Sequence, residues 1–328
     1  MLRREKVVAK KPTFSLSQMS RMMPASVLPW REKVVAKKPT YNSVYNMDKL
    51  FILLKDGKVL KGIKDKSCSH ISIPDSVTSI GRGAFYGCTS LQGIDIPDSV
   101  TEIGERAFED CTSLRSIDIP GSVTDIGWDA FERCTSLQYI DIPNSLTKIG
   151  RGVFKDCTSL RSIDIPDSVT EIGWYAFEGC TSLQSIDIPD SVTCIESSAL
   201  DGTKWYADQP NGMIYINKVL YKLKGETGSK AIAIREGTIS ISSYSFEGCS
   251  SLRSINIPDS VTEIGWYAFK GCTSLKKIHI HRKNPCDINV DASAFEELYG
   301  DCVLLITPGT RWAYRHHPVF GKFKNIET

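Results

Sequence analysis

Cysteine and aspartate, two side chains that could do chemistry, each recur at a step of 23 residues in this chain of 328. Cysteines can form disulfides, bind zinc or act as nucleophiles. Equivalent side chains of a repeat should point the same way rather than at one another, and no C-x-x-C pair occurs in the sequence. We therefore expect buried free thiols that pack as small hydrophobic groups. The repeated cysteines are Cys88, Cys111, Cys134, Cys157, Cys180, Cys249 and Cys272.

The repeated aspartates are the second candidate for chemistry. A catalytic pair of carboxylates needs two different environments, whereas a repeat supplies near-identical ones. The sequence also has no nucleophile elbow, phosphate-binding loop, dinucleotide-binding glycine pattern or H-E-x-x-H motif. We expect no catalytic residue, no cofactor and no small-molecule substrate, so the chain is not expected to be an enzyme. The aspartates are Asp95, Asp118, Asp141, Asp164 and Asp187, and the position continues as Asn256 and His279.

Histidines give a weaker indication of a metal site. His279 and His281 are two residues apart and should share one face of a strand, and His316 and His317 lie further along. No carboxylate or cysteine stands at a convincing ligand spacing from them. No metal site is therefore expected.

A recurring 23-residue unit must position these side chains, and it reads L-x-x-I-x-I-P-x-S-V-T-x-I-G-x-x-A-F-x-x-C-T-S. In one unit, Ile94 and Ile96 fit one face of a short strand that Pro97 ends, because proline has no N–H for a ladder. Ile103, Ala107 and Cys111 follow at the i, i+4, i+8 spacing of a helical stripe. A single unit cannot bury these residues, but stacked units can.

The pattern therefore predicts an α/β repeat solenoid. We expect it to be right-handed and curved, with a parallel sheet on the concave side and short helical arcs on the convex side. No apolar run approaches the ~18 residues needed to span a bilayer.

Interruptions of the period suggest five segments. Residues 1–46 form a basic arm, 47–200 a capping hairpin and a first repeat block, 201–231 a degenerate unit with an inserted hairpin, 232–300 a second block, and 301–328 a C-terminal cap. The hairpins are expected around Asp56-Gly57 and Asn217-Lys218. The second hairpin could be an internal rung of the stack or a protrusion.

The basic arm carries 11 Lys/Arg against 3 Asp/Glu within residues 1–49 and contains a duplicated decapeptide, Arg4–Thr13 and Arg31–Thr40. Such an arm could bind nucleic acid, but its high charge and lack of periodicity favour a disordered extension. Nucleic acid is therefore a weaker alternative partner.

Outward positions of the predicted strands form the candidate binding face. The aspartates should lie about 5 Å apart in successive units, and Arg115 and Arg161 are too few to neutralise them. Tyr139 adds an aromatic contact, and Lys276 and Lys277 make the far end basic. Three interpretations remain: binding of a basic peptide or protein surface, calcium bridging, and solubility alone. The candidate ligand-binding residues are Asp95, Asp118, Tyr139, Asp141, Asp164, Asp187, Arg115 and Arg161.

Trp128, Trp174 and Trp266 share another repeat position and could form an aromatic row that binds a ligand. Glu105 and Arg151 take the same position in other units. This variation favours separate, half-covered surface side chains over a binding row.

The strand motif L-x-x-I-x-I resembles that of leucine-rich repeats, and the unit from Leu160 to Thr170, followed by Ile172-Gly173 and Ala176-Phe177, resembles the BspA-like subfamily. The segments 205–212 and 218–222 resemble an insertion common in that family, and Thr307–Thr310 with Phe320–Ile326 resembles its ending. The resemblance implies a solenoid of the leucine-rich-repeat type and a bacterial surface or secreted binding protein, often an adhesin.

The expected partner is thus a protein, met through the concave sheet in adhesion or host interaction, with the chain itself a monomer. An intracellular interaction scaffold is the alternative, because the Arg-rich start is not followed by the apolar core of a signal peptide. The expected location is accordingly the cell surface or the secreted fraction, with the cytoplasm as the alternative.

Overall fold

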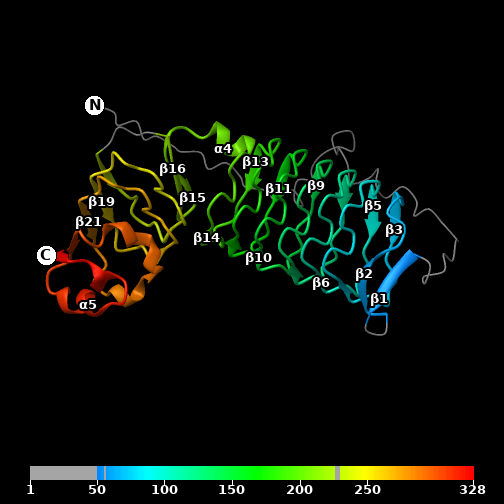
Figure 1. The fold of residues 1–328 in the computed structure, drawn as a ribbon, viewed down its shortest axis with the longest axis horizontal. Helices are drawn as coiled ribbons and strands as arrows, with labels where there is room; N and C mark the ends of the chain where they lie inside the picture. Colours follow the sequence, from blue (N-terminus) through cyan, green and yellow to red (C-terminus); the bar gives the residue numbers. More distant parts are fainter. Residues whose placement is uncertain (1–49, 55–56, 226–229) are drawn as a thin grey trace, which may run out of the picture. The chain divides into compact units, whose positions relative to one another are not determined.

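The computed structural model describes residues 50–54, 57–225 and 230–328, drawn in colour in Figure 1. The chain divides into the units Met1–Met47 and Asp48–Thr328, and the fold described below is that of the second. The predicted basic arm of residues 1–46 lies outside the described residues. The second unit is a parallel β-solenoid, in which successive turns of chain, here called coils, stack on one another.

The predicted I-x-I strands form one side of this stack, the first sheet side. Within each hydrogen-bonded sheet of this side, neighbouring strands are parallel and in register, so that Ser162, Ile163 and Asp164 lie opposite Ser185, Ile186 and Asp187. Isoleucines at the centre of these strands point into the core, and their neighbours point out. The strands are β3 (His70–Ser72), β5 (Gly93–Asp95), β7 (Ser116–Ile117), β9 (Tyr139–Ile140), β11 (Ser162–Asp164), β13 (Ser185–Asp187), β17 (Ala231–Ala233), β19 (Ser254–Ile257), β21 (Lys277–Ile280), β23 (Val303–Ile306) and β24 (Asn325–Glu327).

A second row of parallel strands, the second sheet side, contains the T-x-I part of the repeat. It was not predicted, because a two-residue strand gives too little alternation to be recognised. Each strand places an isoleucine or valine inward and a polar or small residue outward. The strands are β4 (Ser79–Ile80), β6 (Glu102–Ile103), β8 (Asp125–Ile126), β10 (Lys148–Ile149), β12 (Glu171–Ile172), β14 (Cys194–Ile195), β18 (Ser240–Ile241), β20 (Glu263–Ile264) and β22 (Asn289–Val290).

Turns form the third side of the 23-residue coils, so the helical arcs predicted there are wrong, while a 3₁₀ helix at Ala292–Leu298 takes this place in a later coil. Arg106 and Asp110 have φ values of 56° and 61°, which a right-handed helix does not permit. The backbone N–H groups bond sideways instead: Phe108 N donates to Ala130 O of the next coil at 2.7 Å. Ala107 and Cys111 are nevertheless buried, so the inward stripe is correct although the local conformation is not. The handedness and the curvature stay predictions.

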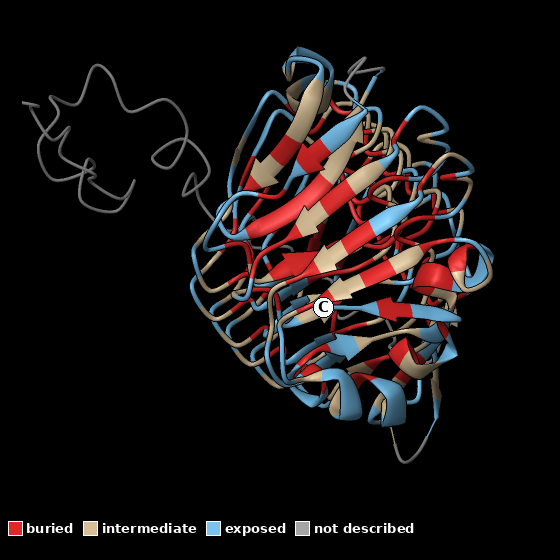
Figure 2. Cartoon of the chain, turned by 90° about the vertical axis from the view of Figure 1, so that its left-hand side faces the viewer, coloured by how far each residue is buried: buried red, intermediate tan, exposed pale blue. Residues whose placement is uncertain are grey.

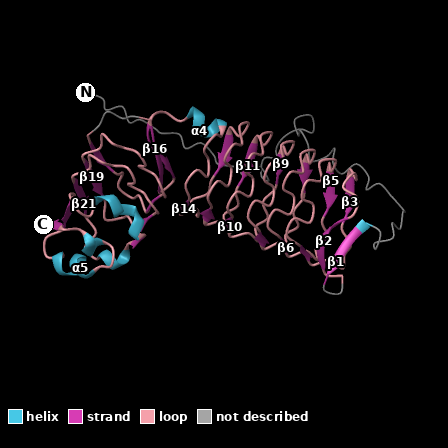
Figure 3. Ribbon diagram, viewed as in Figure 1, coloured by secondary structure: helices cyan, strands magenta, loops and turns pink. Residues whose placement is uncertain are grey.

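Among the described residues, helices occur mainly toward the C-terminal end (Figure 3). They are α4 (Lys204–Asp208), η1 (Pro285–Asp287), η2 (Ala292–Leu298), α5 (Arg311–His316) and η3 (Phe320–Lys322), where η marks a 3₁₀ helix. Phe320 and Phe323 pack with Phe295 in the last part of the core, with ring centroids 5.9 and 5.6 Å away. This aromatic packing covers the end of the stack.

Two antiparallel hairpins open runs of the second sheet side. β1 (Phe51–Leu54) pairs with β2 (Val59–Ile63), which continues in parallel to β4. β15 (Gly212–Ile216) pairs with β16 (Val219–Lys224), which continues in parallel to β18. β16 adds Val219 and Tyr221 to one hydrophobic cluster and Leu220 to the next, because alternate side chains of a strand face opposite ways. The second hairpin is thus an internal rung, while the segment boundaries at 200, 231 and 300 stay predictions.

Ladders of identical side chains fill the core, and Figure 2 shows buried positions alternating with exposed ones along the strands. The phenyl rings of Phe85, Phe108, Phe131, Phe154 and Phe177 stack with centroids 5.0 to 5.7 Å apart. The thiol of Cys134 donates to the carbonyl of Phe108 at 3.2 Å, and other repeat cysteines do the same. All eleven cysteines are free, as predicted, although Cys249 is only half-buried.

Close approach of the coils explains the repeat glycine. A Cβ atom on Gly127 would lie 2.4 Å from the backbone nitrogen of Glu105 in the preceding coil. Any larger residue there would force these two coils apart.

Candidate protein-binding face

The outward side of β5, β7, β9, β11 and β13 places the five repeat aspartates in one row, here called the aspartate face. Each aspartate lies at the end of its strand or immediately after it, and all five side chains are exposed. Asp164 and Asp187 are direct register partners, as the sequence predicted. Paired parallel strands are about 4.8 Å apart, so this ladder of carboxylates is most closely spaced within the pairs β7–β9 and β11–β13.

Repulsion within the ladder affects Asp164, the fourth of the five aspartates. The pKa of Asp164 is raised, first by partial burial and then by the negative charges of Asp187 and Asp141. Two unit charges about 5 Å apart repel by about 0.8 kcal/mol in water, and by more where the protein displaces solvent. At one end, Asp95 accepts a hydrogen bond from the Ser72 hydroxyl at 2.7 Å. The ladder is therefore a surface that a positive charge would stabilise.

Arg115, Arg161 and Tyr139 flank the row. Both arginines are exposed, and across the described residues neither forms an ion pair. Tyr139 lies opposite Ser116 on the neighbouring strand and is also exposed. The predicted site residues thus share one face.

Segment 204–211 bounds this face beyond β13. Trp205 N donates to Leu183 O at 2.8 Å, so the chain that begins α4 occupies the place where a next strand would pair. The first sheet side resumes at β17. The aspartate position is taken there by Ala233, and on β19 and β21 by Asn256 and His279. The acidic row therefore ends at Asp187.

A shallow hollow of about 380 Å³ follows on β17, β19, β21 and β23. Its lining includes the small side chains of Ala231 and Ala233 beside the larger ones of Lys277, His279 and Leu305. The rings of His279 and His281 do share a face, with centroids 4.0 Å apart, and burial followed by the charge of His281 lowers the pKa of His279. The A-x-A pattern at 231–233 was the sequence signal for this hollow, and it was not recognised.

Comparison with known proteins identifies the repeat. A model of the BspA type leucine rich repeat region matches residues 63–173, 147–224 and 221–299. The chain belongs to the BspA-type leucine-rich-repeat family. The resemblance inferred from the strand and proline motifs is thereby confirmed, and six copies of the family unit are matched. The chain matches none of the curated proteins.

Solved structures similar to this BspA-type protein come from several bacteria. A leucine-rich cell surface protein from Faecalibacterium prausnitzii A2-165 has 26% identity and a TM-score of 0.46, over 84% of this chain and 92% of that one. A leucine-rich repeat protein of T. pallidum has 28% identity and a TM-score of 0.42, over 70% and 88% of the two chains. The pneumococcal vaccine antigen PcpA has 16% identity and a TM-score of 0.37, over 85% and 82%.

A second group of carboxylates, missed in the sequence, lies on the second sheet side of this BspA-type stack. Glu196 replaces the repeat glycine and accepts a hydrogen bond from the Ser243 hydroxyl at 2.8 Å. Burial, and then the charge of Glu196, raise the pKa of Glu263. Glu171 contributes to the same repulsion. The departure from glycine at position 196 was the available signal.

Neither carboxylate group is arranged as a metal centre. Over residues 50–54, 57–225 and 230–328, no group of three or more His, Cys, Asp or Glu side chains could hold a metal ion. In the same part of the chain, no helix is long and apolar enough to span a membrane.

Proposed function

We propose that this BspA-type protein binds a basic segment of another protein through the aspartate face. The observation that carries the proposal is the row of five exposed aspartates at one repeat position, with Asp164 in register with Asp187. An exposed row of like charges has an unfavourable self-energy that a partner's lysines or arginines would relieve. Relief of this repulsion would therefore favour the binding of a basic partner.

The other residues of the face would determine which basic partner binds. Tyr139 offers a rigid aromatic contact of the kind that often dominates binding energy. Arg115 and Arg161 would donate hydrogen bonds to acidic groups of the partner, which would fix its register along the row. A solvated row of aspartates that binds nothing is the competing interpretation, and it predicts no loss of binding when the row is neutralised.

Bacterial surface adhesion or host interaction is the proposed setting, and the protein acts there by binding rather than by catalysis. The support is family membership, since the repeat unit is of the BspA type. An intracellular interaction scaffold is the second candidate. The observation that favours it is the set of eleven free cysteines, because unpaired thiols are typical of reducing compartments. Cell fractionation distinguishes the two settings.

A pull-down with a matched pair of triple variants tests the proposal. The full chain serves as bait for proteins of the secreted and surface fractions. The variant D118N/D141N/D164N removes three charges from the aspartate face, while D98N/D167N/D190N removes three from exposed turn residues that follow the repeat proline. We expect the first variant to lose the captured protein and the second to retain it. Equal capture by both would refute the role of the aspartate face.

A further inference from the structure

Two neighbouring coils separate on the second sheet side, between β8 and β10. Elsewhere in this block the repeat glycine N–H bonds to the preceding coil: Gly127 N to Ile103 O at 2.7 Å, and Gly173 N to Ile149 O at 2.8 Å. Among the described residues, no such bond joins Gly150 N to Ile126 O, and β8 and β10 belong to separate sheets. A Cβ atom on Gly150 would find its nearest neighbour, Ile126 O, at 3.5 Å rather than the 2.4 Å found at Gly127.

The separation is local, so it forms a cleft and not a break in the stack. On the third side the same two coils remain joined, with Asp129 N donating to Arg151 O at 2.9 Å. The resulting cleft has a volume of about 590 Å³. Pockets of a few hundred cubic ångströms are the usual size for a small ligand.

Aromatic side chains line this cleft, and their exposure needs an explanation. Trp128 leaves 58% of its surface open to solvent. Its Cδ1 atom would lie 3.7 Å from a Cβ on Gly150, so the indole leans over the gap toward the next coil. Trp174 also lines the cleft and is held by an edge-on contact with Tyr244, with centroids 5.8 Å apart. Trp128 and Trp174 thus belong to one cleft, contrary to the expectation of separate surface side chains.

Charged groups of both signs complete the lining in equal number. Lys148 and Arg151 are balanced by Asp125 and Glu171. The guanidinium of Arg151 lies 5.9 Å from the ring centroid of Tyr175. Arg151 takes the same repeat position as Trp128 and Trp174, in the coil between them. A cationic ligand would meet the lysine and the arginine, an anionic ligand would meet the carboxylates, and a wholly apolar ligand would leave all four charges without solvent.

From this lining we propose that the cleft binds a neutral oligosaccharide. Sugar rings present apolar C–H faces that pack on exposed indoles, and their hydroxyls both donate to carboxylates and accept from guanidinium and ammonium groups. Trp128 and Trp174 are two coils apart, which is about 10 Å at the usual strand spacing and more across the widened gap, so the site spans more than one sugar ring. This site lies on the second sheet side and is independent of the aspartate face.

Binding of uncharged glycans by the full chain tests the assignment. The probes are an array of neutral β-linked and α-linked oligomers of glucose, mannose and N-acetylglucosamine, with sialylated and sulfated glycans beside them. Affinity for the array hits is then measured by titration calorimetry on the wild type, W128A and W266A. Trp266 is the matched control, since it occupies the same repeat position, is 55% exposed and lies outside the cleft.

We expect an uncharged oligosaccharide to bind, W128A to weaken that binding about tenfold or more, and W266A to leave it unchanged. Because Trp128 is mostly exposed, its truncation should not unfold the protein, and identical thermal unfolding of the two variants checks this. Absence of any uncharged ligand would overturn the proposal. So would binding restricted to anionic glycans, or equal affinity of W128A and the wild type.

Discussion

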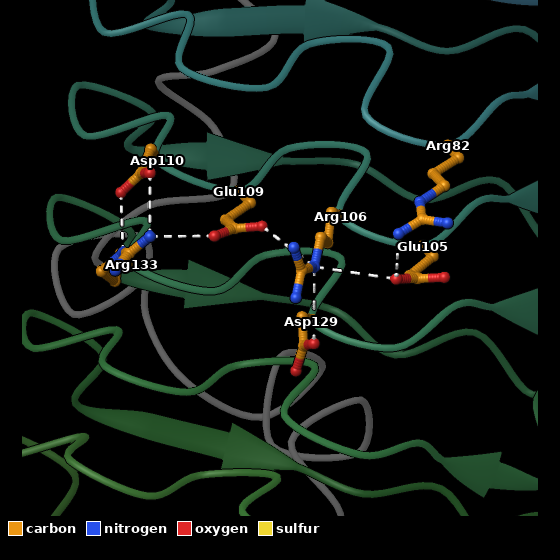
Figure 4. Close-up of polar contacts among 7 residues, drawn as sticks. All are labelled: Arg82, Glu105, Arg106, Glu109, Asp110, Asp129 and Arg133. Carbon is orange, nitrogen blue, oxygen red and sulfur yellow. Dashed lines mark hydrogen bonds and ion pairs between the residues drawn. The ribbon is translucent and has the colours of Figure 1, made fainter.

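The guanidinium of Arg133 holds the buried carboxylate of Glu109 across two adjacent coils, with Nη2 and Oε1 2.8 Å apart. Arg133 also pairs with Asp110 at 2.8 Å, and Arg106 approaches the other oxygen of Glu109 at 3.5 Å (Figure 4). Glu109 is 5% exposed, and burial raises its pKa. The arginine therefore compensates a charge that the fold has removed from water.

Replacing Arg133 should cost more than replacing another arginine of the same network. We expect R133A to lower the free energy of unfolding by about 1–3 kcal/mol, because Glu109 would stay buried with a weaker partner. Arg82, whose side chain is 71% exposed, pairs with Glu105 at 3.1 Å, and R82A should cost less than about 1 kcal/mol. Urea unfolding of both variants measures the difference. Equal losses would show that Glu109 does not depend on Arg133.

Neutralising Asp164 should stabilise the fold at neutral pH. A raised pKa in the folded state means that its charged form is disfavoured there, so this penalty is present above the folded pKa and disappears as pH falls through it. We expect D164N to gain up to about 0.8 kcal/mol at neutral pH, and the gain to vanish below a pH of about 3.9. Asp167, an exposed turn residue after Pro166, supplies the control D167N. Urea unfolding at the two pH values measures both variants, and a D164N gain no larger than that of D167N contradicts the repulsive ladder.

Glu263 should behave in the same direction on the second sheet side. Its pKa is raised first by burial and then by Glu196 and Glu171, so acidification removes an unfavourable charge. E263Q should raise the thermal midpoint at neutral pH, by the equivalent of about 1 kcal/mol, and have little effect at acidic pH. The control is E102Q, at the same repeat position but exposed. Scanning calorimetry at neutral and acidic pH measures the thermal midpoint. A lower midpoint of E263Q at neutral pH would mean that a partner stabilises the charge of Glu263.

The buried thiols should be chemically inert in the native protein. Burial raises the pKa of the Cys134 thiol strongly, which removes the reactive thiolate, whereas Cys286 is exposed. Brief treatment with iodoacetamide should therefore modify Cys286 and leave Cys134 unmodified until the protein is unfolded. Peptide mass spectrometry measures the extent of modification at each site. Modification of Cys134 at the rate of Cys286 would mean that the coils open readily.

Much of this arrangement could be predicted from the 23-residue period, because a repeat places equivalent residues such as Asp164 and Asp187 side by side. The turns on the third side of the coils were harder to predict, because the spacing of Ile103, Ala107 and Cys111 fits a helix and also fits these turns. Left-handed residues such as Arg106 and Asp110 decide between the two, and the glycines Gly83 and Gly87, which take the same repeat positions with positive φ, were the available signal that was not recognised. The cleft beside Trp128 depends on a widened gap between two coils, which no local pattern encodes.

The central claim, that the aspartate face binds a basic partner, is tested most directly by the salt dependence of affinity. The dissociation constant of the captured partner is measured at low and high ionic strength for the wild type, D118N/D141N/D164N and D98N/D167N/D190N. Screening weakens attraction between exposed charges, so the wild type and the turn variant should lose affinity as salt rises. The aspartate-face variant should bind weakly at both salt concentrations. If it instead keeps the affinity and the salt dependence of the wild type, the partner does not bind at the aspartate face.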